Sequence, residues 1–162
     1  MKSKIIAIIA MLGICLSLSA CSQTGNQYES SATSVSTSTT FGTELAEPEE
    51  HGTSAYVDYL FYKAKADSET ATEEDLQSAL DWLKNNVDNI FDNQESMELA
   101  MYNGELLERK YKDSGNSFEK IGWQAYKTVK YVYRGAESVD DQATIDNYSE
   151  LKDLLSSADK IS

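Results

Sequence analysis

The fold is decided by residues 72–90, which have the sequence TEEDLQSALDWLKNNVDNI. Thr72 is followed three positions later by Asp75, a capping-box pattern in which two side chains satisfy N–H groups at the start of a helix. The apolar residues that follow recur every three or four positions, the spacing of one helical face: Leu76, Ala79, Leu80, Leu83, Val87 and Ile90. The stretch predicts an amphipathic helix that must bury this stripe against a partner.

The sequence on both sides, from Thr53 to about Ala158, has the same helical character. It contains no proline, and helix start and stop signals separate its periodic segments. Four further helices are expected: residues 54–66; a helix that starts after Asp92 with Glu95 as its capping-box partner; one from Ser117 to a glycine cap at Gly135; and one that opens at Ser138 with Asp141. Residues 113–116, Asp-Ser-Gly-Asn, predict a turn.

Each of these helices has an apolar face that we expect to point inward. In chain order the faces comprise Tyr56, Tyr59, Leu60 and Ala64; Met97, Ala100, Met101, Gly104, Leu107 and Tyr111; Phe118, Ile121, Ala125, Val129 and Val132; and Ile145, Tyr148, Leu151 and Leu155. About 105 residues are ample for one core, and short connections favour antiparallel neighbours. The expected fold class is all-α, a compact bundle of four to five antiparallel helices over residues 53–158, after a disordered tether.

The N-terminus has the pattern of an export signal. Lys2 and Lys4 precede an uncharged, mostly apolar run from Ile5 to Leu18, which has the length of a signal-peptide core and is short for a membrane span. The small residues Ser19 and Ala20 follow, and then Cys21. Residues 1–20 are therefore expected to be a signal peptide that is removed.

The order Leu18-Ser19-Ala20-Cys21 resembles the lipobox of bacterial lipoproteins. The resemblance implies cleavage before Cys21 and a thioether-linked diacylglycerol, with palmitate-type acyl chains, on its sulfur. It also implies a protein held at the extracytoplasmic face of the cell membrane, which we expect to be a Gram-positive surface. Several acyl chains anchor a protein firmly, whereas one binds only reversibly. The alternative is an ordinary secretory signal in which the cysteine is incidental.

Residues 21–52 are expected to be a disordered linker. From Ser22 to Thr40, 11 of 19 residues are Ser or Thr, too polar to bury a core. Glu44 to Glu50 adds four glutamates and the only proline, Pro48. The chain's second cysteine, Cys15, lies in the signal, so no disulfide and no thiolate metal site is expected in the mature chain.

Charge limits the class of partner. Removal of Lys2 and Lys4 leaves 12 basic residues against 27 acidic ones, a net charge of −15. This charge favours solubility and opposes binding to nucleic acid. The single histidine, His51, is expected to be an exposed linker residue without a catalytic role. We expect no metal and no cofactor, because no zinc, calcium or phosphate-binding motif is present.

One segment departs from the acidic background. Residues 109–134 hold seven basic residues and only two acidic ones. A helical projection gathers a candidate binding face opposite the apolar stripe, composed of Lys120, Trp123, Lys127, Lys130, Tyr131 and Arg134. Cations interleaved with aromatic rings suit an anionic glycan or polymer, or an acidic protein patch. The alternative is that acidic neighbouring helices neutralise these charges and that the aromatic rings are packed inside the bundle.

Three functions fit these observations. The first is a lipid-anchored binding or interaction module at the cell surface, without enzymatic activity. The second is an exclusion or immunity lipoprotein of a mobile element, which the chain resembles only in its small size, Ser/Thr-rich spacer and helical domain. The third is a cell-wall enzyme that uses two carboxylates, which would need an acid with a shifted pKa in a cleft.

Overall fold

The computed structural model describes residues 45–161, which form five α-helices and contain no strand. The predicted all-α bundle is confirmed. The helices are α1 (Ser54–Thr70), α2 (Glu73–Asn86), α3 (Gln94–Tyr111), α4 (Ser117–Tyr133) and α5 (Gln142–Ser157), with one 3-10 turn, η1 (Val87–Asn89), after α2. The predicted signal peptide, Cys21 and most of the predicted linker lie outside the described residues. Within those residues, no helix is long and apolar enough to cross a membrane.

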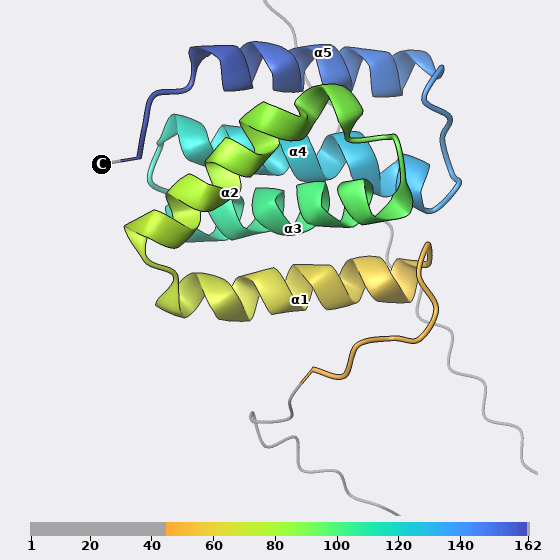
Figure 1. Cartoon of the computed structure of the whole chain (residues 1–162), viewed down its shortest axis with the longest axis horizontal. Coiled ribbons are helices and arrows are strands. Elements are labelled where there is room, and N and C mark those ends of the chain that lie inside the picture. The colour runs from red at the N-terminus through yellow and green to blue at the C-terminus, as the bar shows by residue number, and fades with distance from the viewer. Residues whose placement is uncertain (1–44, 162) are drawn as a thin grey trace, which may run out of the picture. The chain divides into compact units, whose positions relative to one another are not determined.

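Four helices, α1, α3, α4 and α5, lie side by side in that order, and α2 crosses in front of them (Figure 1). Consecutive helices run in opposite directions, as expected for short connections. The neighbours α1 and α3 run in the same direction, because α2 carries the chain back to the end at which α1 begins. The core lies between α2 and this layer and along the contacts that α3 makes with α1 and α4.

The capping box and the apolar stripe of residues 72–90 are confirmed. The Thr72 side chain accepts from the backbone N–H of Asp75, and the Asp75 carboxylate accepts from the N–H of Thr72 at 2.9 Å. All six stripe residues are buried. One detail differs from the prediction, because the α-helix ends at Asn86 and the 3-10 turn η1 carries Val87 into the core.

Two helix boundaries differ from the predicted ones. Helix α1 continues to Thr70 rather than ending at Ala66, since Ser68 is buried and the N–H of Ala71 still bonds to Asp67. Helix α3 is capped by Asn93 and not by Asp92: the Asn93 Oδ1 accepts from the N–H of Ser96 at 2.8 Å. A short amide side chain satisfies the first turn as well as a carboxylate does.

One predicted core residue is on the surface. Ile145 of α5 is 46% exposed, and its neighbour Thr144 is buried in its place. The Thr144 hydroxyl donates to Glu137 at 3.0 Å, which satisfies this polar group in the interior. The predicted positions Leu151 and Leu155 remain buried. Most other predicted inward residues are buried, and five are half-buried: Tyr59, Met97, Tyr111, Val132 and Tyr148.

The predicted glycine cap of α4 is confirmed at Gly135. This residue has a φ of 66°, a left-handed conformation that glycine adopts without steric cost. Its N–H bonds to Val132, and the N–H of Ala136 bonds back to Tyr131 at 2.9 Å. This pair of bonds is the Schellman motif, which satisfies the last carbonyls of a helix.

Helices α3 and α4 approach each other most closely at two glycines. A Cβ atom added to Gly104 would lie 2.7 Å from the carbonyl oxygen of Gly122 and 3.1 Å from the N–H nitrogen of Tyr126. A Cβ atom added to Gly122 would lie 2.5 Å from the backbone nitrogen of Glu108. These atoms are all backbone, so only glycine allows the two helices to pack at this distance.

The folded part extends beyond the predicted limits of residues 53 and 158. The linker was expected to run to Gly52, and this is wrong at its end, because the N–H of Gly52 donates to the Tyr133 hydroxyl at 2.8 Å. Pro48 is also partly buried. At the other end, the N–H of Ile161 donates to the side chain of Gln77 at 2.8 Å. Contacts with the bundle therefore order both ends.

Candidate binding face on helix α4

Helix α4 lies between α3 and α5 (Figure 1). None of the predicted basic and aromatic residues is fully buried. Trp123 is 45% exposed, and Lys120 is exposed beside it. Lys127, Lys130, Tyr131 and Arg134 are half-buried along their stems, as long cationic side chains are when they cover apolar surface. We call these six residues the basic aromatic face.

Lys130 is the centre of this face. Its Nζ lies 5.3 Å from the ring centroid of Trp123 and 4.8 Å from those of Tyr126 and Tyr131, which is within the range of a cation–π contact. The ammonium group therefore lies over three rings at once. Its charge is held in place without a carboxylate, and within the described residues it forms no ion pair.

Tyr126 belongs to this site although the sequence analysis did not include it. It lies four positions before Lys130, and its ring centroid is 6.1 Å from that of Trp123. The i, i+4 spacing could have indicated the contact, but the residue projects onto the flank of the helix and is buried. Burial, and then the charges of Glu105 and Asp58, raise the pKa of Tyr126 to about 12, so its hydroxyl stays neutral.

The other cations of the face differ in their partners. Arg134 lies over the Tyr131 ring at 5.1 Å and donates to the Ser54 hydroxyl of α1 at 3.3 Å. Lys127 is turned toward α5, where its Nζ is 3.9 Å from the Glu150 carboxylate. The structure thus brings Trp123, Lys130, Tyr131 and Arg134 together and places Lys127 at the border with α5.

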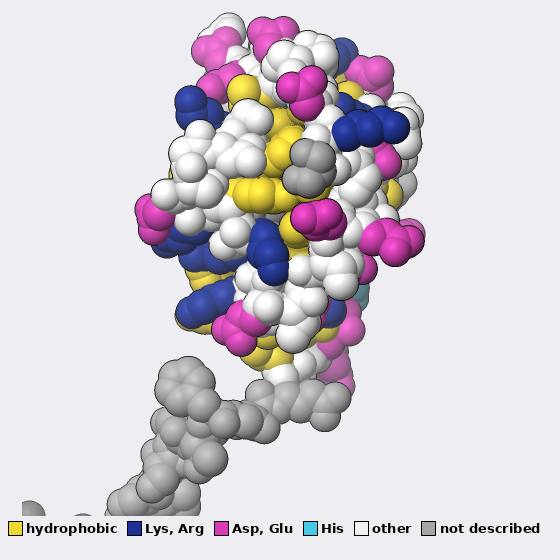
Figure 2. All heavy atoms as spheres, turned by 90° about the vertical axis from the view of Figure 1, so that its left-hand side faces the viewer, with side chains coloured by type: hydrophobic (Ala, Val, Ile, Leu, Met, Phe, Trp, Pro, Cys, Tyr) yellow, Lys and Arg dark blue, Asp and Glu magenta, His cyan; other side chains and the backbone are white. Residues whose placement is uncertain are grey.

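The surface is not uniformly acidic despite the negative net charge. Figure 2 views the end of the bundle at the left of Figure 1, where acidic and basic side chains are interspersed and hydrophobic side chains show between them. Charges farther from a site than the roughly 8 Å Debye length of physiological salt are largely screened, so a local group of cations can attract an anion on a chain with a negative net charge.

A buried acid lies beneath this region, on α3. Glu105 is 1% exposed, and its Oε2 accepts from the Arg109 Nε at 3.1 Å, while its Oε1 has no hydrogen-bond partner among the described residues. Arg109 is shared with Glu108, whose carboxylate is 3.4 Å away. Burial and the charge of Glu108 raise the pKa of Glu105 to about 7, against the opposing effect of Arg109.

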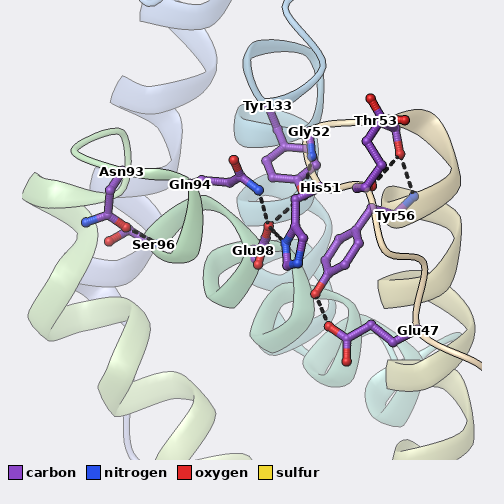
Figure 3. A network of polar contacts seen from close by, with 11 residues as sticks. Glu47, His51, Gly52, Thr53, Tyr56, Asn93, Gln94, Ser96, Glu98 and Tyr133 are labelled. Atoms are coloured by element: carbon purple, nitrogen blue, oxygen red, sulfur yellow. Dashed lines mark hydrogen bonds and ion pairs between the residues drawn. The ribbon is translucent and has the colours of Figure 1, made fainter.

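A polar network fixes the end of the linker to the bundle (Figure 3). Glu98 of α3 accepts from the His51 Nδ1 at 2.7 Å, from the Tyr133 hydroxyl at 2.6 Å and from Gln94 at 3.0 Å. His51 also stacks on the Tyr56 ring at a centroid distance of 4.1 Å. His51 is exposed, as expected, but these contacts fix its ring against α1 and α3, which the sequence did not predict.

This network is a set of satisfied donors and acceptors. Burial alone would raise the pKa of Glu98, but hydrogen bonds from Tyr133, His51 and Gln94 hold it below its ordinary value. Burial and the bond to Glu98 raise the pKa of Tyr133, so the phenol stays a proton donor. The arrangement suits a structural clasp between residues 47–56 and the bundle, in which these donors already have acceptors.

Within residues 45–161, no group of three or more His, Cys, Asp or Glu side chains is placed to hold a metal ion. Comparison with family models, with curated proteins and with solved structures gave no match.

Proposed function

We propose that this protein is an exported, lipid-anchored binding module of the cell surface that uses the basic aromatic face of α4 to bind an anionic glycan or glycopolymer. The observation that carries the proposal is the position of Lys130 over three rings, next to an exposed Trp123. A sugar ring can stack on the indole plane. Its carboxylate, sulfate or phosphate groups can then pair with the ammonium of Lys130 and the guanidinium of Arg134.

The test of the ligand class is the affinity of the full chain, purified in detergent micelles, for a heparin hexasaccharide as the anionic glycan probe. Because ring and charge both contribute, we expect Trp123→Ala and Lys130→Gln each to weaken binding by about tenfold. Lys65→Gln removes an exposed lysine of α1 and is the matched control, with an expected change below about twofold.

Two results would contradict the assignment. Equal losses in Lys130→Gln and Lys65→Gln, with no loss in Trp123→Ala, would mean that the probe senses only overall charge. Tighter binding of hexaglutamate than of the hexasaccharide would point to an acidic protein partner instead.

The lipid anchor is tested at Cys21. In a bacterial host fed with labelled palmitate, we expect the wild-type chain to be labelled and Cys21→Ala to lose the label and leave the membrane, because no acyl chain remains to hold it. Cys15→Ala is the control and should stay labelled, since residue 15 is in the part removed. A wild-type chain that takes up no label would identify an ordinary secretory signal.

The third function, a carboxylate-dependent wall enzyme, needs an acid with a raised pKa that faces a cleft. Among the described residues, Glu105 is the carboxyl group whose pKa is raised. It is 1% exposed and does not line any of the four surface hollows found along α1–α3 and between α2 and α5. The geometry therefore favours the binding module over the enzyme.

A further inference from the structure

A groove runs along α3 on the side where α1 and α2 flank it. It consists of three adjacent hollows. The first, of about 520 Å³, lies between the end of α1, α2 and α3, and the second, of about 390 Å³, lies between α1 and α3. These two share Leu99 and Tyr102. A third hollow continues from Glu98 to His51 at the linker end. Leu99, which is 37% exposed, forms part of the apolar floor.

The walls of this groove are acidic and aromatic. Five carboxylates line it: Glu47, Asp67, Asp75, Glu95 and Glu98. The rings of Tyr59, Tyr102 and Trp82 lie among them. Lys63 is the single lysine or arginine in the lining. The groove therefore combines negative charge with aromatic faces, and this combination favours organic cations.

The chain's own Lys63 shows how a cation binds in the groove. Its Nζ is 2.7 Å from the Asp67 Oδ2 and 4.9 Å from the centroid of the Tyr102 ring. The Tyr102 hydroxyl donates to the same Asp67 oxygen at 2.6 Å, which fixes the carboxylate beside the ring. The Lys63 side chain is 43% exposed, so solvent reaches this pair and an external cation can displace it.

We propose that this groove binds a basic peptide segment in an extended conformation, with a Lys or Arg side chain taking the place of Lys63 between Asp67 and Tyr102. The charge complementarity of five carboxylates selects the cation, and the row of adjacent hollows along α3 selects an elongated ligand. From Tyr56 to Thr70 the helix rises about 21 Å, which accommodates about six residues of extended chain. The partner is thus a protein with an exposed basic segment.

The proposal is independent of the function proposed for α4. The groove and the basic aromatic face share no residue, and each contains one of the two tryptophans of the chain, Trp82 and Trp123. Each ligand can therefore be observed at its own tryptophan, and failure at one site leaves the other site untouched.

The test titrates the full chain carrying Trp123→Phe with hexalysine in about 0.15 M salt and follows the fluorescence of Trp82. We expect saturable binding with a change in the Trp82 emission. Lys63→Met vacates the site between Asp67 and Tyr102, so hexalysine should bind about fivefold tighter. Lys65→Met removes the same charge from an exposed position of the same helix and should change the affinity by less than about twofold.

Equal effects of Lys63→Met and Lys65→Met on the affinity would overturn the proposal, since binding would then reflect only the net charge. A Trp82 emission that does not respond to hexalysine would also overturn it, since the peptide would then not occupy the groove. The other occupant is a second copy of the chain, which would insert its own basic aromatic face. Sedimentation of the full chain distinguishes the two occupants. If the chain forms oligomers, and both added hexalysine and Lys130→Gln dissociate them, the occupant is a second copy and the proposal of a peptide ligand is overturned.

Discussion

Gly122→Ala is expected to lower the free energy of unfolding by at least about 3 kcal/mol, although alanine is ordinarily the better helix former by about 1 kcal/mol. The added Cβ would meet the carbonyl oxygen of Gly104 and the backbone of Glu108. Helix backbone cannot move aside as a side chain can, so α3 and α4 must separate, and the core contacts along both helices weaken. Denaturant unfolding of the full chain measures the loss.

Gly135→Ala is the control for the loss of glycine itself. It forces alanine into a left-handed conformation, φ 66°, where no atom lies within 4 Å of the new Cβ, so it should cost only about 1 kcal/mol. If Gly122→Ala does not fold, Gly104→Ala serves as the milder variant. If Gly122→Ala and Gly104→Ala each lower the free energy of unfolding by less than Gly135→Ala does, the close packing of α3 and α4 is contradicted.

Glu105→Gln is expected to raise the free energy of unfolding at neutral and alkaline pH, where the glycine variants lower it. In the folded chain burial raises the pKa of Glu105 from 4.5 to about 7, so the folded state holds a proton that the unfolded state releases. The stability from this group is fully present below pH 4.5 and is lost as the pH rises through 7. The difference corresponds to about 3 kcal/mol between pH 4.5 and pH 8.

A glutamine has the shape of the protonated acid and stays neutral at every pH. The variant should therefore be more stable than wild type by up to about 3 kcal/mol at pH 8 and nearly equal to it at pH 4.5. The pKa values of Asp67 and Glu98 are lowered in the folded chain. Their contributions to stability are therefore lost only at more acidic pH, and equally in the wild type and in Glu105→Gln. Thermal unfolding across this range measures the difference.

Glu69→Gln removes an exposed carboxylate of α1 and is the matched control. It should change stability by less than about 0.5 kcal/mol at either pH. A wild-type chain whose stability does not fall between pH 5 and pH 8 relative to Glu105→Gln would show that Arg109 neutralises Glu105 and that the carboxylate is not destabilised by burial.

The sequence predicts those parts of the fold that depend on neighbours in the chain. The α2 stripe and its cap, the turn after α3 and the glycine cap of α4 all follow from spacing and backbone preference over a few residues. Ile145 shows the limit of this reasoning, because a helical projection favours the apolar residue over its polar neighbour Thr144, which is the one that is buried. The Thr144 hydroxyl donates to Glu137 in the loop before α5, and the path of that loop is not given by the spacing within the helix.

The candidate sites divide in the same way. The basic aromatic face lies within one helix, so the projection predicts most of its members. The bond from His51 to Glu98 joins residues 47 positions apart, and the bond from Gly52 to Tyr133 joins residues 81 positions apart. Composition alone predicts a linker for His51 and Gly52, because it gives no sign of such distant partners. The groove combines α1, α2 and α3, and the parallel packing of α1 beside α3 that creates it is a property of the assembled bundle.

The central claim is that α4 carries the ligand face. The most direct measurement is a ¹H–¹⁵N correlation spectrum of the full chain, in which the two indole N–H signals are assigned with Trp82→Phe and Trp123→Phe. Addition of the heparin hexasaccharide should shift the Trp123 signal in a saturable way and leave the Trp82 signal in place. A Trp123 signal that stays unmoved while the chain binds the hexasaccharide would contradict the account, because the ligand would then be bound elsewhere.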